Sequence, residues 1–157
     1  MEKKNLKYFM RPEAKEEQVL EVPGLESIKD EQGNVVPLKI KKLHNETINK
    51  INDMYTERAP MRDRKGNFVI QNGEVVFKVE RDRAKATRHI IAEALVEPDL
   101  KDPELMKFFN CADIAEMPLK VFPNNDEYAY ISKKVMQVLG LAEEDEKDGK
   151  ELEAAKN

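Results

Sequence analysis

Few side chains in this 157-residue chain are of types that carry out chemistry. It contains two histidines, His44 and His89, and one cysteine, Cys111. A cysteine nucleophile with a histidine base is conceivable, but nothing in the spacing favours it over a partly buried, inert thiol. Because Cys111 is alone, it cannot form an intrachain disulfide, which is typical of proteins in a reducing compartment.

A metal site is the next chemical alternative. His89 and Glu93 are four residues apart and would lie on one face of a helix, but no further His or Cys cluster completes a ligand set. The pattern therefore favours a polar pair on the surface. Glycine-rich phosphate-binding motifs are also missing from the sequence. These observations favour a protein that is not an enzyme and binds no cofactor.

The composition indicates a lean core beneath a charged surface. Charged residues make up 37% of the chain and hydrophobic residues 40%, with no tryptophan, and the mean hydropathy is -0.70. No apolar run approaches the length of a membrane span, and the first residues lack the apolar region of a signal peptide. We therefore expect a cytosolic protein.

Charge is unevenly distributed along the chain. Residues 1–38 carry 6 basic and 8 acidic side chains, residues 39–88 carry 13 and 7, and residues 89–157 carry 8 and 16. Acidic residues interrupt the basic middle segment and the whole chain is acidic, which argues against nucleic-acid binding. The expected roles are a solvated charged face or a docking surface for an acidic protein. The basic residues concerned are Arg58, Arg62, Arg64, Lys65, Arg81, Arg83, Lys85 and Arg88.

Strand and turn patterns dominate the N-terminal half. Residues 18–22 and 35–43 predict a β-hairpin, with Gly33 in its turn free to adopt positive φ. Residues 44–55 predict a helix. The dipeptide Asn72-Gly73, which is typical of a type I′ turn, predicts a second hairpin between strands at 68–70 and 75–79.

Helical periodicity replaces this pattern from about Arg83. The first helix is expected to end near Val96, because Pro98 disfavours helical backbone in the residue before it. Asp102 and Pro103 have the residue types of a helix N-cap and first position. A short helical piece is expected within 113–122, and a final helix begins in a capping-box-like run at 124–127 and ends at Gly140.

These elements predict an α+β fold. N-terminal antiparallel β-hairpins are followed by a C-terminal bundle of three to four short helices. We expect one domain over residues 1–141, with an N-terminal arm at 1–17, hairpins and one helix at 18–79, and the helical part at 80–141. Residues 142–157 have too few large apolar side chains to fold and predict an acidic disordered tail.

Aromatic and methionine residues gather in the short helices of the second half. Most of them must be core, because the chain has few large apolar residues. Flexible apolar grooves of this composition are also typical of adaptable peptide-binding proteins, so the same residues are candidates for contact with a partner. The six candidates are Phe108, Phe109, Met117, Phe122, Tyr128 and Tyr130.

The order of the local motifs resembles a known family. The run from Ile28 to Ile40, the proline corner at 98–105, and the last helix with its glycine stop are colinear with the phage tail assembly chaperones of the PBSX prophage type, the XkdN-like family. The chain departs from that pattern before the last helix and at the Asn72-Gly73 hairpin. The motif residues are Gly33, Pro98, Asp99, Leu100, Leu105, Glu127 and Gly140.

This resemblance implies a non-enzymatic role in the cytoplasm of a bacterial host. Similar proteins are thought to bind the tape measure protein, keep it soluble while the tail tube assembles, and then leave. Tail tube subunits are a further expected partner, and a homo-oligomer remains open. No nucleic acid, membrane or cofactor is expected. The alternative is a structural component that stays in the phage tail or tail-like particle.

Overall fold

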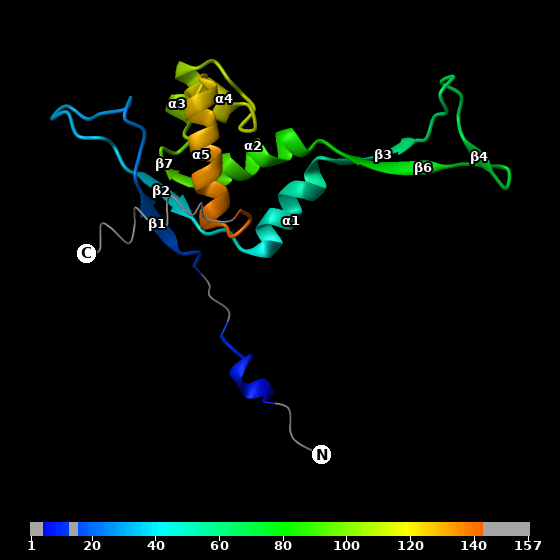
Figure 1. Cartoon of the computed structure of the whole chain (residues 1–157), viewed down its shortest axis with the longest axis horizontal. Helices are drawn as coiled ribbons and strands as arrows, with labels where there is room; N and C mark the ends of the chain where they lie inside the picture. Colours follow the sequence, from blue (N-terminus) through cyan, green and yellow to red (C-terminus); the bar gives the residue numbers. More distant parts are fainter. Residues whose placement is uncertain (1–4, 13–15, 143–157) are drawn as a thin grey trace.

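A computed structural model describes residues 5–12 and 16–142 of the chain. A body of one small sheet and several helices lies at the centre, and a long two-stranded arm projects from it (Figure 1). The chain forms both antiparallel strands and helices, so the predicted α+β class is confirmed. Most of the acidic tail predicted for 142–157 lies outside the described residues.

The sheet of the body has the strand order β1-β2-β7 and is antiparallel throughout. Strands β1 (Val19–Val22) and β2 (Leu38–Lys41) form the first predicted hairpin. In its turn Gly33 has φ +83°. Ile40, at the centre of β2, is completely buried. The alternation of residues in β2 thus directs its apolar side chains into the core and its lysines outward.

The third strand, β7 (Leu95–Glu97), was not expected. Helix α2 (Arg83–Ala94) ends two residues before the predicted end at Val96, and the chain continues directly into β7. Leu95 pairs with Ile40 and Glu97 pairs with Lys39. Pro98 prevents helical backbone before it, and the exposed edge of β2 supplies hydrogen-bond partners for an extended chain.

Helices α1, α3, α4 and α5 lie beside α2 and the sheet (Figure 1). Helix α1 precedes the arm, and α3, α4 and α5 follow β7, in agreement with the expected C-terminal bundle of short helices. Their buried side chains meet in one apolar core that includes Ile91, Phe122 and Val135. The bounds are η1 Leu6–Tyr8, α1 Asn45–Met54, α3 Pro103–Phe108, α4 Met117–Val121 and α5 Asn125–Val138.

Two of the predicted helix ends are confirmed. The carboxylate of Asp102 accepts hydrogen bonds from the backbone N–H of Glu104 and Leu105, which confirms it as the N-cap of α3. After α5, Gly140 has φ +74° and donates its N–H to Gln137 in a Schellman ending.

The capping box predicted for α5 is wrong. Asn124 occupies the N-cap position but makes no side-chain cap hydrogen bond. The carboxylate of Glu127 instead accepts a hydrogen bond of 2.9 Å from the hydroxyl of Ser27. A tertiary contact to the loop between β1 and β2 thus replaces the expected local one.

The projecting arm is a ribbon whose two sides are each divided into two strands. At its base β3 (Thr56–Pro60) pairs with β6 (Phe77–Arg81), and at its tip β4 (Ile70–Gln71) pairs with β5 (Glu74–Val75). Strands β3 and β4 thus lie on one side of the ribbon, and β5 and β6 lie on the other. The turn at Asn72-Gly73 is confirmed, since both residues have positive φ. However, the hairpin expected between 68–70 and 75–79 is wrong beyond the tip, because β6 pairs with β3.

Candidate partner-binding surfaces

His89 is a buried residue that packs against Tyr55. It is buried in α2, and its Nδ1 lies 2.6 Å from the hydroxyl of Tyr55. The two rings also meet edge to face. Burial lowers the pKa of His89 below its usual value, so the neutral ring is favoured. The interaction joins the end of α1 to α2.

Cys111 makes a local hydrogen bond to the backbone two residues further along the chain. It is partly buried, and its thiol donates a hydrogen bond of 3.2 Å to the backbone carbonyl of Asp113. The predicted partly buried thiol is therefore observed. Within residues 5–12 and 16–142, no group of three or more His, Cys, Asp or Glu side chains is placed to hold a metal ion.

Two cations of the basic middle segment, Lys85 and Arg88, form ion pairs within the body. Lys85 and Asp113 form an ion pair of 3.3 Å, and Arg88 pairs with Glu116 at 3.3 Å. Arg88 also donates from Nε to the carbonyl of Ala115. The amide of Ala115 is the main cause that lowers the pKa of Asp113, with Lys85 contributing. These contacts fasten α2 to the segment that leads into α4.

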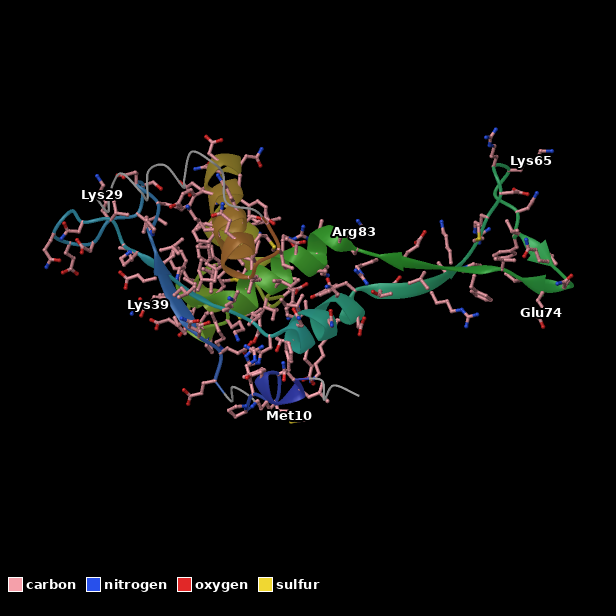
Figure 2. All side chains as sticks on the ribbon, turned by 60° about the horizontal axis from the view of Figure 1, so that its bottom comes forward. Met10, Lys29, Lys39, Lys65, Glu74 and Arg83 are labelled. Carbon is pink, nitrogen blue, oxygen red and sulfur yellow. The ribbon has the colours of Figure 1, made fainter. Side chains whose placement is uncertain are left out.

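Other cations of that segment lie on the arm. The guanidinium of Arg58 lies 4.4 Å from the centre of the Phe77 ring, and that of Arg62 lies 4.3 Å from the Phe68 ring. Figure 2 shows the side chains along the arm extending into solvent on both sides of the ribbon. The basic residues that are adjacent in sequence are thus divided between a packed interface and an exposed arm.

The six aromatic and methionine residues predicted to contact a partner do not form one surface. Phe108 is 79% exposed at the end of α3. Met117 and Phe122 are completely buried in the core. The other three are partly buried and pack against that core: Phe109, Tyr128 and Tyr130. Only Phe108 is freely accessible to a partner without movement of the body.

Two further exposed apolar surfaces are present that the sequence patterns did not single out as contact sites. One is the short helix η1 with the residues that follow it, and the other is the arm. Strand β3 lacks the alternation of apolar and polar residues that predicts a strand, so the sequence did not indicate the arm. The exposed residues are Leu6, Tyr8, Phe9 and Met10 near the N-terminus and Met61, Phe68, Ile70, Val75, Phe77 and Val79 on the arm.

An open pocket lies where the arm meets the body. Its volume is about 590 Å³, and both acidic and basic side chains line it. The lining residues include Tyr55, Glu57, Glu80, Arg81 and Lys85.

None of the helices in the described ranges is long and apolar enough to cross a membrane.

Comparison with known proteins gives a consistent picture. Residues 6–156 match the model of the family described as phage XkdN-like tail assembly chaperone protein. The chain is 29% identical over 153 residues to the uncharacterized protein YqbN of Bacillus subtilis, which covers 98% of this chain and 93% of that protein. It is 26% identical over 150 residues to the phage-like element PBSX protein XkdN of the same organism, covering 96% and 93%.

The fold itself has a solved counterpart. The crystal structure of YqbN superposes with a TM-score of 0.66 at 22% identity, and the match covers 90% of this chain and 100% of that one. Together with the family match over nearly the whole length, this confirms the resemblance noted from the motifs. The chain belongs to the family of XkdN-like phage tail assembly chaperone proteins.

Proposed function

We propose that this chain is a non-enzymatic chaperone that binds the tape measure protein in the cytoplasm of the bacterial host. It keeps that protein soluble until the tail tube polymerises around it, and then leaves the particle. Membership of the tail assembly chaperone family over residues 6–156 is the observation that carries the proposal.

Exposed apolar side chains supply the physical support. A tape measure protein presents long apolar stripes that aggregate unless they are covered. Phe108 and the aromatic residues Tyr8 and Phe9 are exposed on segments at the periphery of the body. Such contacts are small and separate, which suits many modest, reversible interactions rather than one tight interface. Phe109, Tyr128 and Tyr130 are partly buried and pack against the core, so they would contact a partner only if the body moved.

Co-expression with the tape measure protein from the same tail gene cluster tests the proposal. We expect the tape measure protein to move from the insoluble to the soluble fraction and to copurify with the chain. The test variant is Phe108→Ala, which removes the exposed aromatic ring and should reduce the soluble fraction of the tape measure protein. A tape measure protein that is equally soluble alone would contradict the proposal.

The fate of the chain in finished particles separates the two candidate roles. A chaperone that leaves should be missing from purified tails by mass spectrometry, although it is abundant in the lysate. If the chain is found in stoichiometric amounts in purified tails, it is a retained structural component instead.

A further inference from the structure

The outer edge of β6 is an exposed strand edge at the base of the arm. Within the described part of the chain β6 pairs with β3 and with no other strand. All five of its residues are exposed, and Val79 is 73% exposed. An exposed edge with apolar side chains is a template for pairing with a further strand, and proteins usually cover or block such edges.

Hydrogen bonds at the two ends of the β3–β6 ladder identify the backbone groups that point outward. The N–H of Met61 donates to the carbonyl of Val76, and the N–H of Asp82 donates to that of Tyr55. In an antiparallel ladder, hydrogen-bonded and non-hydrogen-bonded pairs alternate. Along β6, backbone groups that bond to β3 therefore alternate with backbone groups that point away from it. Those whose N–H and C=O point away from β3 are Phe77, Val79 and Arg81.

Only one of the two edges of the β3–β6 ladder has a backbone donor and acceptor at every outward-pointing position. On β3 the outward-pointing positions are Thr56, Arg58 and Pro60. Pro60 has no N–H and blocks that edge, as prolines do on edge strands. On β6 each of the three outward-pointing positions has both a donor and an acceptor. The arm therefore offers β6 as its pairing edge.

We propose that the β6 edge binds the same edge of a second copy of the chain, antiparallel and centred on Val79. In this register Val79 lies opposite Val79 of the partner subunit, and all outward-pointing backbone groups of both strands find partners. Phe77 lies opposite the partner's Arg81, and Lys78 lies opposite the partner's Glu80. The inference concerns the chain alone and does not depend on the proposed function.

The sequence of β6 is complementary to itself in this register. On one face the two Val79 side chains meet, and Phe77, already stacked under Arg58 at 4.4 Å, receives a second guanidinium from the partner's Arg81. On the other face Glu80 stands opposite Glu57 of its own chain. Two glutamates directly opposite each other repel. The partner's Lys78, which lies opposite Glu80 on its other side, places a cation beside them and offsets this repulsion.

Neighbouring registers lack this complementarity. Moving the centre by one residue, to Lys78 or to Glu80, would keep the outward-pointing backbone groups aligned but would place two lysines or two glutamates opposite each other. Moving it by two residues to Arg81 would place two arginines opposite each other and set Glu80 against the partner's Asp82. Both charge pairs would repel. The Val79 register therefore satisfies the backbone and the side chains together.

Charge reversal with mixing tests the register. Sedimentation equilibrium should show a concentration-dependent dimer for the wild-type chain. Lys78→Glu and Glu80→Lys each create two like-charged pairs across the interface and should weaken the dimer about tenfold or more. An equimolar mixture of the two variants should dimerise again, because each interchain pair then has opposite charges. The ion pair between Lys78 and Glu80 within one chain is not restored in the mixture, so recovery reports the interface alone.

Two outcomes of this experiment would overturn the proposal. One is a wild-type chain that remains monomeric over the whole concentration range. The other is a mixture that dimerises no better than the separate variants, although circular dichroism shows that both are folded.

Cysteine cross-linking gives an independent measure of the register. In a Cys111→Ser background, Val79→Cys places two thiols in a directly opposed pair with Cα atoms about 5.5 Å apart, within disulfide reach. Lys78→Cys is the matched control, because its two copies would be diagonal neighbours about 7–8 Å apart. Under mild oxidation the Val79 variant should form dimers and the Lys78 variant should not. Equal cross-linking of both variants would contradict the register.

A tape measure strand is the competing occupant of this edge. Val79→Pro removes one outward-pointing N–H and leaves the hydrogen bonds between β3 and β6 intact. For the proposed dimer this variant should be monomeric. If the wild-type chain is monomeric and this variant loses its ability to keep the tape measure protein soluble, then the edge binds the tape measure protein and the proposed self-association is wrong.

Discussion

The hydroxyl of Tyr55 and Nδ1 of His89 lie 2.6 Å apart and connect the end of α1 to α2. The arm begins at Thr56, directly after Tyr55, so this contact anchors the base of the arm to the body. Burial raises the pKa of Tyr55 and lowers that of His89, which keeps both groups neutral near pH 7. The pair is thus a structural hydrogen bond between neutral groups.

Removing the hydroxyl should destabilise the body. Tyr55→Phe leaves Nδ1 of the buried His89 without its partner, and we expect the free energy of unfolding to fall by about 1–2 kcal/mol. Urea denaturation followed by circular dichroism measures the change. The matched control is Tyr8→Phe at an exposed tyrosine, which should leave the midpoint unchanged. Equal midpoints for both variants would show that the contact contributes nothing to stability.

Stability should decrease in mild acid because of His89. Its pKa is lowered in the folded state, mainly by burial, while Glu93 and Asp113 oppose the shift and Lys101 adds to it. The unfolded chain therefore takes up this proton first. The contribution is complete above a pH of about 6.5 and is lost as the pH falls toward the folded pKa. Urea midpoints between pH 5 and 8 should show this decline. His89→Gln should flatten it, and an unchanged slope would exclude His89 as the cause.

Two phenylalanines predicted as partner contacts should behave differently when shortened. Phe122 is completely buried, so Phe122→Ala should reduce the free energy of unfolding by about 3–5 kcal/mol. Phe108 is mostly exposed, so Phe108→Ala should change it by less than about 0.5 kcal/mol. Thermal unfolding of both variants measures the difference. If the Phe108 variant loses much of its stability, then its weaker partner binding would be explained by unfolding and not by the loss of a contact.

Two glycines should tolerate alanine to different degrees. A Cβ at Gly24 would collide with the backbone carbonyl of Val36, so Gly24→Ala forces the chain between β1 and β2 to move and should cost about 3 kcal/mol. Gly66 has φ +84° but open space around it, so Gly66→Ala should cost only about 1 kcal/mol from backbone strain. Urea denaturation compares the two variants, and the reverse order would contradict the packing at Gly24.

Short-range chemistry explains the parts that the sequence predicted well. The turns at Gly33 and at Asn72-Gly73 require positive φ, and all three residues have it. Asp102 caps α3 through its own carboxylate, and Gly140 ends α5. Each of these features depends on residues within a few positions of one another, so a single sequence contains the information. The order of such motifs was also enough to indicate the family.

Contacts between distant segments decided the rest. Thr56–Pro60 has no apolar alternation, and it forms a strand because Phe77–Arg81 returns beside it. Leu95 and Val96 were predicted as the end of a helix, but Leu95–Glu97 is a strand because β2 has a free edge for it to pair with. Phe108 and Phe122 are the same residue type, one the last residue of a short helix and the other the residue after one, yet Phe108 is exposed and Phe122 is buried. Strand pairing and burial depend on which segments meet in space, and local residue patterns do not contain that information.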